Sequence, residues 1–441
     1  MITSDVFGNV IEAIQYDTLG SDVGGVGSER RTRFNYDLQG RLIDVQDPEN
    51  AFFAYTYDVF GNRLTSDDPG LGYWTMQYDE HGNLTQQTDA KGQTLTFTYD
   101  GLDRVKTKVV SGGSNGTQSY SYGYDTVWGQ PNYIGKLSDV SHNQTGNSIS
   151  YKYTNLGNVR EVKTKISGQT LQTNTYFNAN GSVDKHSISR FLSTGSGFNW
   201  LYEFTYDAAG RVTRYGDWGT KPVDYITYNH WGQPTRTDYG NNTYDLIAYD
   251  AERGWVDKIE TYDGANTLIQ MSDYTRDASG RIVSVDAEQT EARFDYTYDY
   301  AGRLLSAVNS DGFSQYDRSY TYDAAGRMRD NSGLGVYNYS LLTPDHAPAS
   351  ITIGAATVPL TYDANGNMTA SFDGRTMSYD GENRPLSVTT GTNQTTAFTY
   401  APDGTRALKV TDQGTAQEVT TYTTGMLEAR FSSAGLDALV V

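Results

Sequence analysis

Residues 36–42 read Tyr-Asp-Leu-Gln-Gly-Arg-Leu, and close variants of this heptapeptide recur along the chain. Each well-preserved variant has Asp directly after Tyr and Gly three residues after the Asp. Such copies begin at Tyr57, Tyr78, Tyr206, Tyr298 and Tyr322. The most regular ones start 21 residues apart. A fixed period in this range is typical of repeat architectures, in which each unit packs on its neighbours.

The residues that precede each motif alternate between apolar and polar. Leu95, Phe97 and Tyr99 point to one face of an extended chain, and Thr96 and Thr98 point to the other. This period of two predicts a β-strand with one covered face. Tyr is therefore expected to be the last inward residue before each turn.

The Asp and the Gly of the motif predict a tight turn. Asp can accept hydrogen bonds from backbone N–H groups just downstream, and Gly can adopt positive φ at the fourth position. Asp103 and Asn383 replace this Gly in two copies, and both residue types tolerate the left-handed region. Apolar residues lie two and five positions after the Gly, as at Leu42 and Val45. That spacing of three does not fit alternation and predicts a bulge or a strong twist.

A second turn follows about ten residues later, for example at 47–50, 67–70 and 89–92. Each unit is thus a two-stranded hairpin, and about 18 units follow one another. We predict an all-β fold, a repeat array of antiparallel β-hairpins that forms a curved, spiralling strip or partial hollow shell. The array is expected over 1–424 as one continuous repeat domain, irregular at 125–205 and 329–355. The segment 425–441 is expected to be a strand pair or a mobile tail.

Composition limits the classes of function. The chain has 441 residues and a formal net charge of −19, which argues against binding to nucleic acid or to an anionic membrane surface. It has no cysteine, so disulfides and Cys-ligated metals are excluded. No apolar run is long enough to span a membrane. The first ten residues lack a signal-peptide pattern and look like the second half of a repeat, so we expect the chain to begin inside a larger array.

Few residues are candidates for chemistry. The five histidines lack metal-ligand spacing and are expected to be surface turn residues: His81, His142, His186, His230 and His346. With 36 tyrosines, proximity of a Tyr to a His is no signal for acid–base catalysis on a polysaccharide. Each turn offers one Asp that is committed to its own backbone, which disfavours calcium. We therefore predict no catalytic residue, no cofactor and no metal site.

Two tryptophans are candidates for ligand contact. Trp128 and Trp231 lie in similar turns, Trp-Gly-Gln-Pro at 128–131 and at 231–234. An exposed Trp can stack on the face of a sugar. It can equally cap the sheet edge or pack on the next turn, and this second interpretation is favoured.

Three further stretches carry a family resemblance: 362–368 (Tyr-Asp-Ala-Asn-Gly-Asn-Met), 379–386 (Tyr-Asp-Gly-Glu-Asn-Arg-Pro-Leu) and 400–406 (Tyr-Ala-Pro-Asp-Gly-Thr-Arg). With the earlier motifs, they resemble the YD-repeat, or RHS-repeat, family over nearly the whole chain. That family includes bacterial RHS toxin shells and is related to teneurin and Tc-toxin C-component shells. The resemblance implies a hollow shell that encloses a C-terminal toxic effector. Bacterial shells of this family end in a core region with an aspartate-dependent self-cleavage site, and no such motif precedes Val441, so no catalytic residue is carried over.

The expected function is structural and not enzymatic. The resemblance implies a shell segment that encapsulates or delivers a polymorphic toxin in a secreted bacterial system. Its partners would be a toxin cargo or neighbouring repeat segments of a larger chain, and its location would be secreted or at the cell surface. The alternative is a carbohydrate- or cell-surface-binding adhesion module, for which a glycan would be the partner.

Overall fold

The computed structural model describes residues 1–16, 29–125, 133–191, 197–216, 222–287, 292–340, 346–424, 427–432 and 435–440. Nearly all ordered structure in these ranges is β, which confirms the predicted fold class. A short 3-10 helix, η3 (Ser314–Tyr316), lies between two of the strands. Trp128 falls in 126–132 and lies outside the described residues.

The strands follow one another in chain order, and each pairs antiparallel with the next. Those of the first sheet are β1 (Ile2–Ser4), β2 (Val10–Tyr16), β3 (Glu29–Tyr36), β4 (Leu42–Gln46), β5 (Phe52–Tyr57), β6 (Arg63–Asp68), β7 (Gly72–Tyr78), β8 (Leu84–Thr88), β9 (Thr94–Tyr99), β10 (Val105–Ser111), β11 (Gln118–Tyr124), β12 (Leu137–His142), β13 (Ser148–Tyr153), β14 (Val159–Ile166), β15 (Gln169–Phe177), β16 (Val183–Phe191), β17 (Gly197–Tyr206), β18 (Val212–Gly216), β19 (Val223–Tyr228), β20 (Pro234–Tyr239), β21 (Tyr244–Tyr249), β22 (Val256–Tyr262), β23 (Leu268–Arg276), β24 (Ile282–Ala287), β25 (Ala292–Tyr298), β26 (Leu304–Asn309), β27 (Arg318–Tyr322), β28 (Met328–Asn331), β29 (Gly335–Tyr339), β30 (Pro348–Ile353) and β31 (Ala356–Pro359).

The second sheet has nine strands, from β32 to β40. They are β32 (Thr361–Tyr362), β33 (Met368–Ala370), β34 (Thr376–Tyr379), β35 (Pro385–Thr389), β36 (Thr395–Tyr400), β37 (Arg406–Thr411), β38 (Val419–Thr424), β39 (Leu427–Ser432) and β40 (Gly435–Val440). The last two pair antiparallel, so the C-terminal segment forms a strand pair.

The motif forms the turn that its residues predict, and we call it the Tyr-Asp turn. In the copy at Asp37, the Gly40 N–H donates to the Asp37 carbonyl at 3.0 Å and the Asp37 N–H donates to the Arg41 carbonyl at 2.9 Å. The Asp37 carboxylate accepts from the backbone N–H groups of Gln39 and Arg41. Gly40 has φ +76°, and the two substitutes for Gly, Asp103 and Asn383, have φ +58° and +61°.

A β-bulge follows each well-formed Tyr-Asp turn, which confirms that prediction. Tyr36 pairs with Leu42, whereas Asn35 pairs with Asp44, so Ile43 is an extra residue in the second strand. The bulge places Leu42 and Val45 on the same face as the inward tyrosine, although they are three residues apart.

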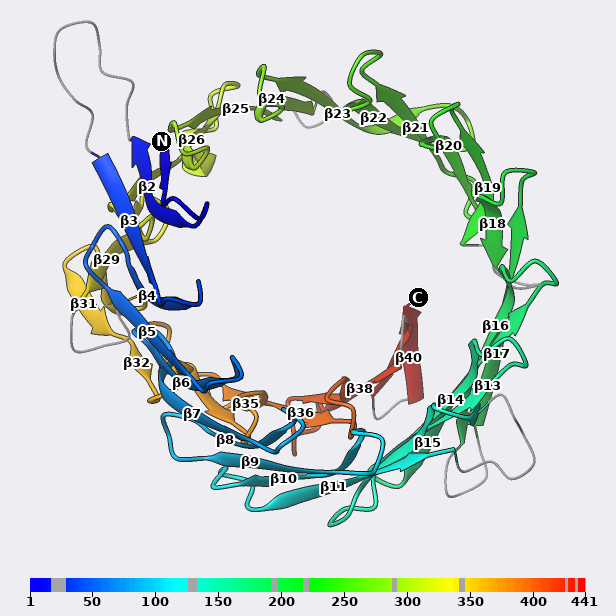
Figure 1. Ribbon diagram of the computed structural model, residues 1–441. Coiled ribbons are helices and arrows are strands. Elements are labelled where there is room, and N and C mark those ends of the chain that lie inside the picture. Colours follow the sequence, from blue (N-terminus) through cyan, green and yellow to red (C-terminus); the bar gives the residue numbers. More distant parts are fainter. Residues whose placement is uncertain are drawn as a thin grey trace, which may run out of the picture.

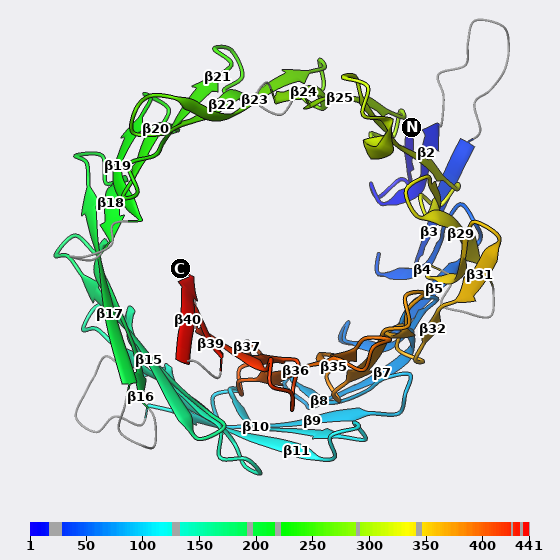
Figure 2. The ribbon, with the colours of Figure 1, turned by 180° about the vertical axis from the view of Figure 1, so that it is seen from behind.

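The hairpins stand side by side and curve into a ring (Figure 1). All Tyr-Asp turns lie along one edge of the strip, the Tyr-Asp edge. The intervening turns, which we call back turns, lie along the other edge, the back edge. After one full circuit the strip overlaps itself, with β31 to β36 beside β5 to β11 in both views (Figures 1 and 2). Hydrogen bonds between the circuits join residues 265 to 276 apart, which is about 13 repeats of 21 residues.

The largest apolar clusters lie in this part of the ring. One groups Val110, Tyr120, Val140 and Ile149. The other brings Ile166 and Leu171 of the first circuit against Ala401, Ala407, Leu408 and Tyr422 of the second. No β-ladder joins the two circuits within the described ranges, so the sheet is an overlapping strip and not a closed barrel.

Candidate functional site

Neighbouring repeats are joined by a hydrogen bond that most of the regular units share. The Tyr57 hydroxyl donates to the carbonyl of Leu42 at 2.8 Å, and Leu42 is the second residue after the Gly of the preceding Tyr-Asp turn. Thirteen other tyrosines make the same bond: Tyr36, Tyr99, Tyr124, Tyr153, Tyr206, Tyr228, Tyr249, Tyr298, Tyr322, Tyr339, Tyr362, Tyr379 and Tyr400. The motif tyrosine is therefore a link between neighbouring repeats as well as an apolar side chain.

Arg276 replaces this tyrosine in the copy that lacks it. Its Nη1 donates to the carbonyl of Val256, the second residue after Gly254. A guanidinium reaches the same acceptor as the phenol, because both put a donor at the end of a long side chain. The link is thus retained in a repeat whose motif has changed.

Arginine after the Gly makes a second link, which we call the arginine clamp. Arg41 Nε donates to Asp37 Oδ2 of its own turn at 2.6 Å, and its Nη1 donates to the Asp58 carbonyl of the next turn at 2.6 Å. Its guanidinium also lies 5.1 Å from the ring centroid of Tyr57. The clamp recurs at Arg211, Arg281 and Arg303.

Asn in place of this Arg bonds the Asp of its own turn, and at Asn83 and Asn367 it also donates to a side-chain oxygen of the next turn, Asp103 Oδ1 and Asn383 Oδ1. Asn62 donates to Asp58 of its own turn and contacts no carbonyl of the next one. Sequence reasoning treated Arg and Asn as equivalent here and missed the clamp. The signal was present, since the length and the several donors of Arg suit it to bridge two turns.

The arginine also sets the charge state of the turn, both in the clamp and at Arg104, which donates to Asp100 of its own turn and to the carboxylate of Asp125 in the next. The side-chain hydrogen bond from Arg104 holds the pKa of Asp100 at about 2. A hydrogen bond from the Arg281 side chain likewise lowers the pKa of Asp277. Such carboxylates stay ionised and hydrogen-bonded, so they are poorly suited to donate or to take up protons near neutral pH.

The two circuits meet along a seam, where Tyr-Asp turns of the second circuit pack on back turns of the first. Lys108 Nζ lies 2.6 Å from Glu382 Oε1, and both side chains are largely buried. Lys91 Nζ lies 2.9 Å from Asp363 Oδ2. Asn365, itself buried, donates to Asp89 Oδ2 at 2.5 Å. Paired and hydrogen-bonded charges of this kind fix the register between the circuits.

Glycines allow the seam to close. A Cβ on Gly366 would lie 2.1 Å from the Gly70 carbonyl oxygen. A Cβ on Gly113 would lie 2.7 Å from the Gly381 nitrogen. Backbone therefore packs directly on backbone at these points, and any side chain there would separate the circuits.

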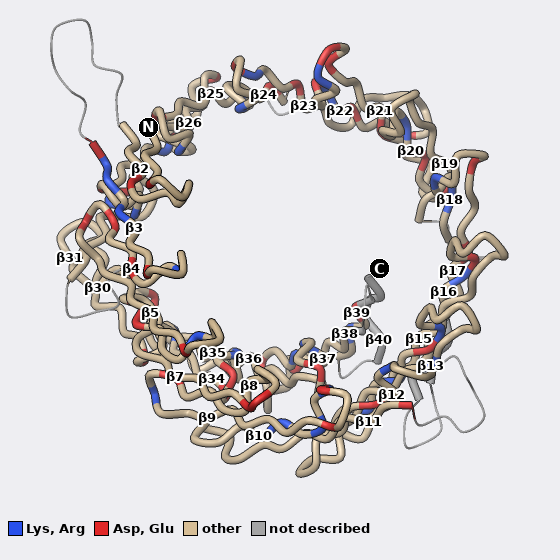
Figure 3. Tube along the Cα trace, viewed as in Figure 1, with Lys and Arg blue, Asp and Glu red and all other residues tan. Residues whose placement is uncertain are grey.

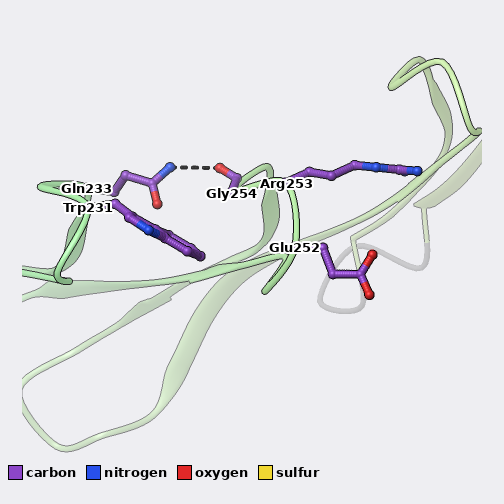
Figure 4. Close-up of a pocket in the computed structure, with 5 residues that line it drawn as sticks. All are labelled: Trp231, Gln233, Glu252, Arg253 and Gly254. Atoms are coloured by element: carbon purple, nitrogen blue, oxygen red, sulfur yellow. Dashed lines mark hydrogen bonds between the residues drawn. The ribbon is translucent and has the colours of Figure 1, made fainter.

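Trp231 lies at the Tyr-Asp edge beside a shallow hollow of about 390 Å³ that it lines with Gln233, Glu252, Arg253 and Gly254 (Figure 4). The indole is half exposed, and the Gln233 amide donates to the Gly254 carbonyl at 2.7 Å. Arg253 points away and lies over the Trp255 ring at 4.7 Å. The structure places an open aromatic face next to a carboxylate and an amide.

The histidines lie in three different environments. His81 and His230 are exposed turn residues, as predicted. The prediction is wrong for His142, which is buried at the end of β12 and contacts Gln118 and Thr145, and for His186, which lies within β16. Strand alternation places these two side chains in the sheet. His346 is at the seam, with Nε2 3.3 Å from Asp47 Oδ2.

Charge is distributed evenly around the ring. Acidic and basic residues are interspersed around the described part of the ring (Figure 3). Over the part of the chain that is described, no group of three His, Asp or Glu side chains could hold a metal ion. The same part contains no helix that is long and apolar enough to cross a membrane.

Comparisons with known proteins agree with this geometry. Residues 36–70 and 78–115 match the RHS Repeat family, and residues 139–310 match the Teneurin YD-shell family. A search of curated protein sequences gave no significant match.

Several solved structures share the fold. A crystal structure of TcdB2-TccC3 matches with a TM-score of 0.79 at 19% identity, over 99% of this chain and 25% of that chain. The Photorhabdus luminescens Tc holotoxin pore, with a mutated TccC3, gives 0.78 at 19% identity, over 99% and 24%. TcdB2-TccC3-Cdc42 gives 0.77 at 20% identity, over 97% and 24%. The chain thus spans about a quarter of the length of the solved chains that it matches.

Proposed function

Because the chain belongs to the YD-repeat, or RHS-repeat, family, we propose that it is a segment of a hollow shell that houses a toxin polypeptide. The observation that carries the proposal is that the strip completes a circuit and overlaps itself. In the overlap, Lys108 contacts Glu382, which lies 274 residues further along the chain. A strip that winds past itself surrounds an interior, whereas an open strip presents only a surface. The wall acts by enclosure, and we assign it no reaction.

The cargo and the rest of the shell would come from further polypeptide. The chain spans about a quarter of the solved chains that it matches, one of which is a component of a Tc holotoxin pore. We therefore propose a bacterial, secreted toxin system as its setting. The hydrogen bonds from the motif Tyr and Arg side chains to backbone carbonyls of the neighbouring repeat suit this role. They join neighbouring repeats in addition to the apolar contacts between them.

Protease protection of the cargo tests enclosure. The native full-length protein that contains this chain is treated with trypsin, and its non-repeat portion is followed by mass spectrometry. The proposal expects that portion to survive while the wall is intact and to be digested at least tenfold faster when the seam is opened by Gly366→Leu. Equal digestion in both proteins would contradict enclosure.

Binding to a carbohydrate is a second candidate, which the hollow at Trp231 favours. The half-exposed indole offers an apolar face, and Glu252 and Gln233 offer hydrogen-bonding groups beside it. A glycan array probed with this chain should give a signal that Trp231→Ala abolishes. Tyr300→Ala is the matched control, because Tyr300 is an exposed aromatic residue in another Tyr-Asp turn. No signal, or equal loss in both variants, would reject this candidate.

A further inference from the structure

A histidine is buried in the first circuit close to the seam. His142 lies at the end of β12 and is 6% exposed. Strand pairing places Tyr120 opposite His142 and Lys108 opposite Tyr120, so the three side chains form a row on one face of the sheet. The Tyr120 and His142 rings meet edge to face at 4.8 Å. At the other end of the row, Lys108 makes the ion pair with Glu382 of the second circuit.

The hydrogen bonds of His142 fix its tautomer. The Gln118 amide nitrogen donates to the Asn115 carbonyl at 2.6 Å, so the other amide atom is the oxygen, and this oxygen lies 2.6 Å from His142 Nε2. Nε2 therefore carries a proton and donates it. Nδ1 accepts from the backbone N–H of Thr145 at 3.1 Å and lies 2.7 Å from the Thr145 hydroxyl. The site thus holds the neutral imidazole and uses its unprotonated nitrogen as an acceptor.

The surrounding charges also oppose a second proton on His142. The titratable side chains around His142 and Tyr120 on the neighbouring elements are Lys108, Asp380, Glu382 and Arg384. The two cations already pair with the two carboxylates, Lys108 with Glu382 and Arg384 with both. Burial, and then the charges of Arg384 and Lys108, lower the pKa of His142 below its ordinary value. A protonated imidazole would be a third cation in this group.

We propose that His142 is an acid-sensitive latch of the seam, which stays closed while the imidazole is neutral and opens when the imidazole takes up a proton. A proton on Nδ1 would point at the N–H of Thr145, so the back turn after β12 would have to rearrange. The added charge would repel Lys108 and Arg384, which hold Glu382 at the seam. The proposal concerns how the wall opens and does not depend on what the wall encloses.

The direction of the pH dependence follows from linkage. The closed seam binds the proton more weakly than the open one, in which His142 has its ordinary pKa of about 6.5. Closure therefore has its full stability above that pH and loses it as the pH falls further. The ratio of open to closed seam should rise by up to about tenfold between about pH 7.5 and pH 5.5. His346 acts in the opposite sense, since its protonated ring would pair with the Asp47 carboxylate, 3.3 Å away.

Thiol labelling can measure seam opening, because the chain has no cysteine of its own. Val110→Cys places a thiol at a side chain that is 2% exposed and packs on Gly381 of the second circuit. Its labelling rate, relative to that of the urea-unfolded chain at the same pH, should rise about tenfold from about pH 7.5 to pH 5.5. Met271→Cys is the matched control, because Met271 is buried in β23, away from the overlap, and its relative rate should not change (Figure 1). No rise at position 110, or an equal rise at position 271, would overturn the proposal.

Replacing the histidine separates its effect from that of other titratable groups. His142→Asn keeps an acceptor for the Thr145 N–H and takes up no proton in this range, so it should abolish the rise at position 110. His346→Asn should retain the rise. A rise that persists in folded His142→Asn would overturn the proposal.

Nuclear magnetic resonance of the ¹⁵N-histidine-labelled parent protein decides the matter if His142→Asn does not fold. The His142 signals, assigned by replacing the other histidines one at a time, should show a proton on Nε2 alone at about pH 7.5. The second proton should be taken up only below about pH 6.5. A His142 ring that is mostly doubly protonated at about pH 6.5 or above would overturn the proposal.

Discussion

Lys108 and Glu382 stand 274 residues apart in the sequence, and their Nζ and Oε1 atoms lie 2.6 Å apart. The ammonium also lies 4.5 Å from the ring centroid of Tyr120, and the second carboxylate oxygen of Glu382 is 2.8 Å from Arg384 Nη2. The pair joins the back edge of the first circuit to the Tyr-Asp edge of the second. It therefore reports directly on whether the strip has closed on itself.

Removing one partner of this pair should destabilise the seam. Lys108 and Glu382 are 10% and 18% exposed, so Glu382→Gln leaves a nearly buried ammonium without its counter-charge. We expect a loss of roughly 3 kcal/mol in the free energy of unfolding. The double variant Lys108→Met/Glu382→Gln should recover part of it, because no unpaired ammonium remains. Urea unfolding of the single and double variants measures this coupling, and additive effects would contradict it.

Gly366→Ala should be worse than the same change at Gly302. Both glycines have φ +78°, so both substitutions incur about 1 kcal/mol of backbone strain. A Cβ at Gly302 meets open space, whereas at Gly366 it meets the Gly70 carbonyl at 2.1 Å. Gly366→Ala should therefore cost a further 1–3 kcal/mol. Equal urea midpoints for the two variants would mean that the circuits do not touch.

The contribution of a single tyrosine hydroxyl to the free energy of unfolding should be measurable. Tyr298→Phe removes the donor to the Ile282 carbonyl and should lower the free energy of unfolding by about 1 kcal/mol. The exposed turn residue Tyr300 gives the control, and Tyr300→Phe should change it by less than about 0.5 kcal/mol.

Arg276 tests whether Arg and Tyr are interchangeable as the donor that links neighbouring repeats. Arg276→Ala should cost about 2 kcal/mol, since a charged donor to the Val256 carbonyl is lost. Arg276→Tyr should restore most of that stability by supplying the donor of the regular repeats. Thermal unfolding of the two variants decides the matter, and an Arg276→Tyr protein as unstable as Arg276→Ala would show that the shared acceptor is incidental.

Acid should loosen the Tyr-Asp turns at a pH set by the arginine that donates to the Asp carboxylate of the turn. The pKa of Asp100 is about 2 in the folded chain and about 3.9 in an unfolded one. A depressed folded pKa gives stability that is present above the unfolded pKa and is lost as pH falls through the folded value. The urea midpoint should thus fall between about pH 4 and pH 2, and less steeply in Asp100→Asn. Parallel curves for the two proteins would exclude this contribution.

The repeating parts of the fold could be predicted because their causes are local. Asp, Gly and the inward Tyr act within one hairpin, and the bulge follows from the spacing between Leu42 and Val45. The seam could not be predicted, because Lys91 and Asp363 lie 272 residues apart and no pattern in the sequence relates one to the other. The arginine clamp lay between these cases. Its residues recur in the motif, but its acceptor belongs to the next repeat.

The candidate site was predicted only in part. Trp231 is exposed at a hollow, and Trp128 lies outside the described residues. The Leu38 turn and the Ala324 turn cannot be distinguished from sequence alone, because their different surroundings arise only when the strip has wound once. Ligand contact at Trp231 stays a prediction.

Zero-length carbodiimide crosslinking tests ring closure most directly, because the reagent joins amines and carboxylates that are already in contact. Peptide mapping of the treated native chain should recover Lys108 joined to Glu382 and Lys91 joined to Asp363. The local pairs Lys152 with Glu161 and Lys185 with Glu203 serve as internal controls. If the control pairs crosslink and neither seam pair does, the strip does not close, and the shell interpretation fails.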